Sequence, residues 1–190
     1  MRNLEEFYTG RVNCFEKEIA DLNQRLFLFS LLRLGVFLLT ILAIYFASVN
    51  AKYVVGVLLV GIPAFLFLVS KHSDLKYQKS KKEELKRINA IELQVLKRDY
   101  SQLENGKEFA TDQHYYSQDI DLFGQGSFYQ VSNRTKLMEG SRLLAEIYTG
   151  NSITGITDKQ EAIKEIGEKV DWRQEFSAMA AFTKTETPTA

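Results

Sequence analysis

The chain has 190 residues, with 24 basic and 24 acidic side chains, so its formal net charge is zero. This balance excludes the polybasic character that attracts nucleic acid non-specifically through phosphate contacts. The single cysteine, Cys14, excludes an internal disulfide framework and a multi-cysteine metal site.

The first 26 residues are predicted to form a cytoplasmic amphipathic helix. Apolar residues recur there at spacings of four and three, the a/d stripe of a heptad: Tyr8, Val12, Phe15, Ile19, Leu22 and Leu26. Charged residues occupy other positions, as expected for the solvent-exposed face of a helix. One face of this helix therefore needs a partner.

Residues 27–72 are predicted to form a transmembrane helical hairpin. Residues 27–49 include one charge, Arg33, and a helix of these 23 residues spans about 34 Å. Residues 53–70 are 18 uncharged residues, or about 27 Å, near the lower limit for a span. Pro63 removes one backbone donor, a defect that a bilayer-spanning helix can accommodate. One alternative is a pair of buried helices in a soluble protein. A cleaved signal peptide is a weaker alternative, because a charged segment of 26 residues precedes the first apolar run.

Basic residues after the second run predict the orientation of the hairpin. Residues 71–87 contain seven basic and three acidic residues, whereas the connection between the runs has only Lys52. By the positive-inside rule both termini are cytoplasmic, which predicts a multi-pass protein of the inner (cytoplasmic) membrane. Arg33 is near enough to the cytoplasmic end to extend toward the lipid headgroups, and a functional intramembrane charge is the alternative.

Residues 73–108 are predicted to form an amphipathic stalk helix that ends near Asn105 and Gly106. Its apolar stripe is less regular than the first and comprises Leu85, Ile88, Ile91, Val95, Leu96, Tyr100 and Leu103. This helix can pair with the N-terminal helix of the same chain or with another chain, as in a homodimer. The sequence leaves both arrangements open.

Residues 109–180 are predicted to form a small helical segment. Ser127 can begin a helix that runs to Arg134 or slightly beyond, and Gly140 breaks or bends it. A second helical stripe then follows at Leu143, Leu144, Ile147 and Tyr148, with Leu143, Leu144 and Ile147 on the buried face. Asp158 and Glu161 resemble a capping pair for another helix, whose apolar face is Ile163, Ile166 and Val170. Residues 181–190 are predicted to form a flexible tail.

Two short patterns in this segment resemble chemical sites. Asp119 and Asp121, near His114, suggest a carboxylate metal site, but two acids at this spacing are usually a turn or a helix cap. Gly124 and Gly126 precede a predicted helix, as in phosphate-binding loops, yet the Gly-x-x-x-x-Gly-Lys-Ser/Thr pattern is missing from the sequence. The sequence therefore predicts no catalytic, cofactor-binding or metal-binding residue in this chain, and no enzymatic activity.

An Asn-Arg-Thr sequon begins at Asn133. The predicted topology places it in the cytoplasm, where it is not glycosylated. The sequon therefore gives no modification site.

An ordered set of short motifs lies between residues 109 and 180, namely Asp121-Leu122-Phe123-Gly124, Gly126-Ser127, Asn133-Arg134-Thr135, Gly140, Arg142-Leu143-Leu144 and Lys159-Gln160-Glu161-Ala162-Ile163. This set resembles the opening of the core, or lever, domain in MutS-like DNA mismatch-repair proteins, and also membrane-bound MutS relatives. The resemblance implies an all-α, membrane-anchored part of a DNA-repair-related ATPase.

The mismatch-reading domain, the clamp and the ATPase of that family are missing from this sequence. ATP and Mg²⁺ are accordingly expected only for a C-terminal ATPase domain of a longer parent protein, and DNA contact only through that parent. The lipid bilayer is the expected partner of this chain, and a homodimer is possible. A non-enzymatic, membrane-anchored coiled-coil interaction or scaffold protein is the alternative.

Overall fold

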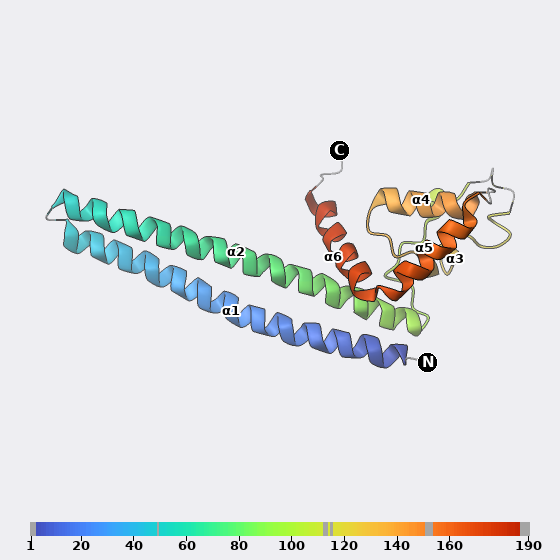
Figure 1. Ribbon diagram of the computed structural model, residues 1–190, viewed down its shortest axis with the longest axis horizontal. Helices are drawn as coiled ribbons and strands as arrows, with labels where there is room; N and C mark the ends of the chain where they lie inside the picture. Colours follow the sequence, from blue (N-terminus) through green and yellow to red (C-terminus); the bar gives the residue numbers. More distant parts are fainter. Residues whose placement is uncertain (1–2, 49, 112–113, 115, 151–153, 187–190) are drawn as a thin grey trace. The chain divides into compact units, whose positions relative to one another are not determined.

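The computed structural model describes residues 3–48, 50–111, 114, 116–150 and 154–186, and every regular element in them is helical (Figure 1). The elements are α1 (Leu4–Ala47), α2 (Ala51–Leu96), the 3-10 helix η1 (Lys107–Phe109), α3 (Phe128–Ser132), α4 (Met138–Thr149), α5 (Ile156–Glu168) and α6 (Val170–Glu186). The predicted all-α class is confirmed. The chain divides into unit 1, residues 1–12 and 84–190, and unit 2, residues 13–83.

In unit 2, α1 and α2 pack side by side in opposite directions. The rings of Phe37 and Phe65 lie 6.4 Å apart, and Lys82 forms a 2.6 Å ion pair with Glu18. Gly61 lies so close to Thr40 that a Cβ atom at position 61 would be 2.8 Å from the Thr40 side chain. These contacts form an antiparallel pair, with Val49 of the connection outside the described residues.

The predicted heptad stripe of α1 is its less exposed face. Phe15 is buried, and the other five stripe residues are half-buried. The stripe of α2 includes buried Leu85 and Ile91, and α2 continues through Pro63. Within unit 2, α2 of the same chain packs on this face of α1, where the Lys82 ammonium lies 5.4 Å from the Phe15 ring centre.

Tyr129 is the centre of the core of unit 1. Its side chain is fully buried, its ring packs against Phe109, Phe123 and Tyr148, and its hydroxyl donates a 3.1 Å hydrogen bond to the Ser141 carbonyl. One tyrosine thereby joins η1, the loop before α3, and α4. Burial of so much aromatic surface, with the phenol hydrogen-bonded, accounts for the order of this mostly non-helical stretch.

The helix after the second apolar run is shorter than predicted. It ends at Leu96, and Arg98 adopts the left-handed conformation with φ of 63°. The amides of Arg98 and Asp99 bond back to the carbonyls of Val95 and Gln94 in a tight helix-ending turn. Tyr100 and Leu103, although half-buried, therefore do not continue the helical stripe.

The start of α3 is as predicted, because Ser127 is the N-cap and its hydroxyl accepts a 3.1 Å bond from the Gln130 amide. The helix stops at Ser132, before Arg134. Gly140 neither breaks nor bends a helix, since it lies inside the first turn of α4. That prediction was wrong because α3 and α4 are separate helices joined by residues 133–137.

The predicted buried face of α4 was also wrong. Leu143 and Ile147 are 56% and 47% exposed, and Leu144 is half-buried. The helix packs instead through Ser141 and Ala145, which are buried. Small residues on this side let the α4 backbone approach Tyr129, which hydrogen-bonds to the Ser141 carbonyl.

The last two helices differ from the prediction in their boundaries and exposure. The N-cap of α5 is Gly155, with φ of 69°, so Asp158 lies in the first turn instead of capping it. Ile163 and Ile166 are exposed, and Val170 is half-buried at the start of α6. Helix α6 continues to Glu186, into the segment predicted to be a flexible tail, whereas residues 187–190 lie outside the described part of the chain.

Candidate functional site

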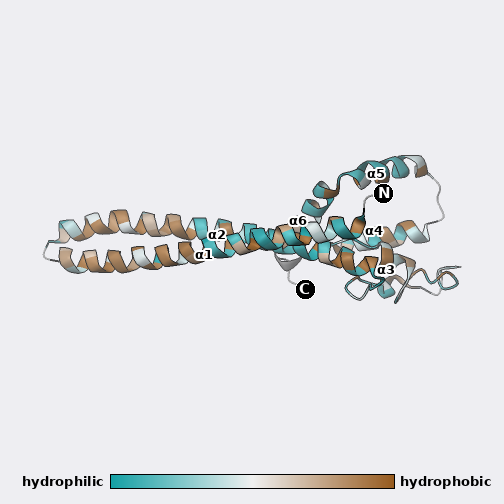
Figure 2. Cartoon of the chain, turned by 90° about the horizontal axis from the view of Figure 1, so that it is seen from below, coloured by the Kyte–Doolittle hydropathy of each residue, from teal (hydrophilic) through white to brown (hydrophobic). Residues whose placement is uncertain are grey.

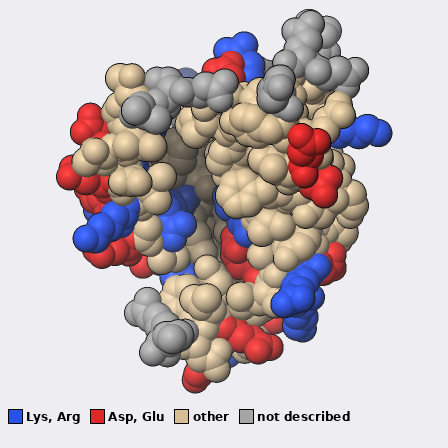
Figure 3. All heavy atoms as spheres, turned by 90° about the vertical axis from the view of Figure 1, so that its right-hand side faces the viewer, with Lys and Arg blue, Asp and Glu red and all other residues tan. Residues whose placement is uncertain are grey.

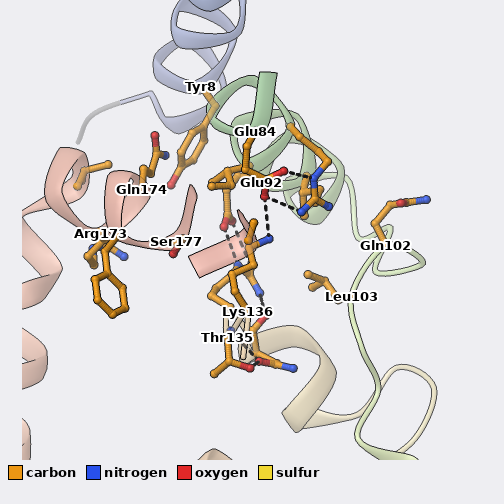
Figure 4. A pocket seen from close by; sticks show the side chains of 18 of the residues that line it. Tyr8, Glu84, Glu92, Gln102, Leu103, Thr135, Lys136, Arg173, Gln174 and Ser177 are labelled. Carbon is orange, nitrogen blue, oxygen red and sulfur yellow. Dashed lines mark hydrogen bonds and ion pairs between the residues drawn. The ribbon is translucent and has the colours of Figure 1, made fainter. Parts of the chain in front are cut away.

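A cavity of about 570 Å³ lies in unit 1 (Figure 4). Its walls come from the start of α1, the C-terminal part of α2, residues 102–104, residues 133–136, and α6. These segments are far apart in the sequence, and the charged residues of one wall belong to α2 and to the connection between α3 and α4. The cavity is therefore a product of the tertiary fold.

Two carboxylates of α2 organise the charged wall. Glu84 accepts two bonds from the Arg87 guanidinium at 2.6 and 2.7 Å, and the Lys136 ammonium lies 3.6 Å from it. One turn beyond Ile88, Glu92 accepts two bonds from Arg134, at 2.6 and 3.1 Å. Paired guanidinium and carboxylate groups of this kind fix geometry as well as charge.

Burial changes the acid–base properties of this wall. The pKa of Lys136 is lowered from its ordinary value, first because burial penalises the ammonium and then because Arg87 is close, while Glu84 opposes both effects. Burial, and secondarily the charge of Glu92, raises the pKa of Tyr8. Hydrogen bonding to Glu84 raises the pKa of Arg87. Tyr8 and Arg87 thus keep their protons more firmly than usual.

Helix α6 forms another wall of the cavity, which includes two aromatic residues. The rings of Trp172 and Phe176 stack 5.4 Å apart with an angle of 12° between their planes, and both residues are more than half exposed. A buried amide pair, Asn89 and Gln174, joins α6 to α2 beside this wall. An ion pair of 2.6 Å between Arg11 and Asp171 joins α6 to α1.

Chemically, the charged wall holds its shape and is not arranged for proton transfer. Both glutamates accept bonds from cations, so neither is poised as a general base. The described residues contain no cluster of three or more histidine, cysteine or acidic side chains that could hold a metal ion.

The structure places Asp119, Asp121 and His114, the residues of the disfavoured metal-site pattern, in separate local roles. Asp119 and Asp121 are exposed residues of a turn, and Asp121 has φ of 47°. The His114 Nε2 atom lies 2.9 Å from the Thr149 carbonyl oxygen. The turn interpretation thus accounts for both aspartates.

The glycines before α3 also have structural roles. Gly124 and Gly126 have φ of 107° and 76°, and their amides donate to the Asn105 carbonyl and the Gln130 side chain. Because these two N–H groups already have partners within the chain, they do not form a phosphate cradle. Gln130 additionally donates to the carbonyls of Tyr100 and Leu103, which fastens the loop after α2 to α3.

The Asn133 sequon is part of the same framework. Asn133 is 3% exposed, and its side-chain oxygen accepts bonds from the amide and hydroxyl of Thr135 at 2.9 and 2.6 Å. The Thr135 and Ser141 hydroxyls lie 2.6 Å apart. A buried, bonded asparagine organises the turn between α3 and α4 and is not a surface acceptor.

The apolar stretches of α1 and α2 form a second kind of surface. Each helix is long and apolar enough to cross a membrane, and no residue of either apolar window is buried in the structure. Figure 2 shows the hydrophobic band that these stretches form on both sides of the connection. Near that connection, Tyr45, Phe46 and Tyr53 are 74%, 72% and 68% exposed, and aromatic residues of this kind are enriched where membrane meets water.

The cavity was missed at the sequence level. Its local signals were the Glu84 and Arg87 pair at i and i+3 and the apolar stripes that include Tyr8 and Ile88. No local signal joins Glu84 to Lys136 or Glu92 to Arg134, because these pairs cross 52 and 42 positions.

The chain matches no family model, no curated protein and no solved structure in comparisons with known proteins.

Proposed function

We propose that the chain is the membrane-anchoring and core portion of a MutS-like, DNA-repair-related ATPase, with ATP hydrolysis belonging to a longer parent protein. The observation that carries the anchoring part is that α1 and α2 each include a membrane-length apolar stretch and also supply residues to helical unit 1. Each of these helices continues without a break from its apolar stretch into residues of unit 1.

The core part of the proposal is supported by the roles of the residues that carry the family resemblance. Leu122 is buried, Ser127 caps α3, and Asn133 and Thr135 form the turn before α4. Arg134 pairs with Glu92 of α2. These residues hold the helices of unit 1 together. A core domain that transmits motion needs such a rigid framework.

The charge distribution favours indirect DNA involvement. On the face drawn in Figure 3, acidic and basic side chains are interspersed and form no continuous basic field. Strong duplex binding through phosphate contacts requires several clustered cations. We therefore assign DNA contact to the parent protein.

A non-enzymatic scaffold is the second candidate, and the exposed apolar side chains of unit 1 favour it. Those on α4, α5 and α6 are Leu143, Ile147, Ile163, Ile166, Trp172, Phe176 and Met179. Exposed apolar surface of this extent is available to a protein partner. Sequencing the messenger RNA beyond the Ala190 codon separates the candidates, since a phosphate-binding loop in the same reading frame supports the ATPase and an immediate stop supports the scaffold.

Membrane topology tests the anchoring part directly. In a Cys14→Ser background, single Gly10→Cys, Asn50→Cys and Ala110→Cys variants are treated with a membrane-impermeant maleimide, with and without permeabilisation of the inner membrane. We expect labelling of the position 50 variant in both conditions and of the other two only after permeabilisation. Opposite accessibility of positions 10 and 110 would contradict the two-span anchor.

A further inference from the structure

The antiparallel register of unit 2 identifies which charges share one level of the hairpin. The contacts of Thr40 with Gly61, of Phe37 with Phe65, and of Glu18 with Lys82 pair residues whose numbers add to about 101. The same register puts Arg25 level with Lys76. It also puts Arg33 level with Leu68, and Lys71 between these two levels.

Cations therefore dominate a short band of the hairpin, made of residues 25–33 of α1 and 68–76 of α2. The band contains Arg25, Arg33, Lys71 and Lys76 but only one acid, Asp74, which lies 4.0 Å from Lys71. The nine residues on each helix extend over about 12 Å. The excess of positive charge is concentrated where the apolar runs begin and end.

Of these four cations, Arg33 is the one that lies within an apolar run, residues 27–49. It is half-buried, and its spacing of seven from Thr40 places it on the face that contacts α2. Within the described residues Arg33 forms no ion pair or hydrogen bond, and a charge at the edge of hydrocarbon is costly unless it is paired. Helical side chains tilt toward the N-terminus, which directs Arg33 toward the level of Lys71.

We propose that Arg33, Lys71, Arg25 and Lys76 form a binding site for the phosphate of an anionic phospholipid of the phosphatidylglycerol type, in the leaflet on the side of the N-terminus. The lipid phosphate supplies the anion that Arg33 lacks, and the surrounding cations distinguish an anionic lipid from a zwitterionic one. The inference rests on the membrane-spanning part of the proposed function. It adds lipid selectivity, which spanning alone does not require.

The test uses the full chain in phosphatidylcholine vesicles that contain traces of spin-labelled phosphatidylglycerol or phosphatidylcholine. The fraction of each label immobilised at the protein gives the ratio of their association constants. We expect the wild-type ratio to favour phosphatidylglycerol by at least roughly fivefold, the effect of about one cation near a membrane surface. Arg33→Gln should reduce this preference several-fold, Arg33→Lys should retain most of it, and 0.5 M salt should weaken it.

A second variant guards against a change in helix packing at position 33. Lys71→Gln/Lys76→Gln alters two exposed residues of the band and should also lower the ratio, whereas Lys17→Gln, an exposed residue outside the band, should leave it unchanged. If the wild-type chain stays in the vesicles at pH 11 but associates equally with both lipids, the lipid-binding inference is overturned and the membrane span is not. Release of the wild-type chain at pH 11 would overturn the membrane span and, with it, both proposals.

Discussion

Asn89 and Gln174 form a reciprocal amide pair in which each side chain donates to the other, at 2.9 and 3.0 Å, across 85 positions of sequence. Asn89 is fully buried and Gln174 is 7% exposed. Asn89 also donates to the Leu85 carbonyl one turn earlier at 2.7 Å. The pair therefore satisfies two buried amides and holds α6 against α2.

Asn89→Leu should destabilise unit 1 by about 1–3 kcal/mol, because it leaves the Gln174 amide buried without its partner. The measurement is urea unfolding of the full chain in detergent, followed by the fluorescence of Trp172, the single tryptophan, which belongs to unit 1. Asn89→Leu/Gln174→Met should recover part of the loss, since both polar partners are removed. Gln160→Leu on exposed α5 is the matched control, and an equal loss there would contradict the role of the pair.

Gly106→Ala should be more destabilising than Gly155→Ala. Both glycines are left-handed, with φ of 66° and 69°, so both variants pay about 1–2 kcal/mol of backbone strain. At position 106 the new Cβ atom would also meet the Tyr129 ring at 2.5 Å, whereas nothing lies within 4 Å at position 155. The overpacking adds about 1–3 kcal/mol. Equal denaturation midpoints for the two variants would show that Tyr129 moves aside without cost.

Gly61→Val should weaken the packing of α1 on α2, and Gly56→Val should not. A Cβ atom at position 61 meets Thr40, whose hydroxyl is fixed by a 2.7 Å bond to the Val36 carbonyl, while position 56 has open space. Helix packing in membranes favours small residues at such contacts. In a Cys14→Ser/Phe37→Cys/Phe65→Cys background, oxidative crosslinking should fall several-fold with Gly61→Val only. The same crosslinking yield in the Gly61→Val and Gly56→Val variants would mean that Gly61 and Thr40 are not in close contact.

The stability of unit 1 should fall as the pH rises above about 10, and Tyr129 should contribute to this fall. Burial is the main cause that raises the pKa of Tyr129 above its ordinary value near 10. Between the two pKa values the unfolded chain has released the proton and the folded chain has kept it, so added base favours unfolding. Tyr129→Phe should be less stable at pH 7 but should show a smaller loss between pH 9 and 11. Parallel pH profiles would argue against a raised pKa.

Local sequence patterns were enough to predict the helical class, the two apolar runs and the heptad face of α1. Each follows from residues near one another: a stripe from Tyr8 to Leu26 defines a helix face, and the N-cap at Ser127 needs only its own side chain and the amide three residues later. Hydrophobic burial and capping act over one or two helical turns. They therefore leave a periodic signal in the sequence.

Only the tertiary structure decided what the polar residues do. Asn133 and Gln130 look like surface residues in the sequence but are buried. Carbonyls of the distant Tyr100 and Leu103 accept bonds from Gln130, whereas the nearby Thr135 donates to Asn133. Leu143 and Ile147 have the periodicity of a core face but are exposed, because Ser141 and Ala145 let α4 approach Tyr129 more closely. The cavity wall likewise depends on ion pairs between separate segments. Periodicity shows which residues share a face, whereas long-range packing determines which face is covered.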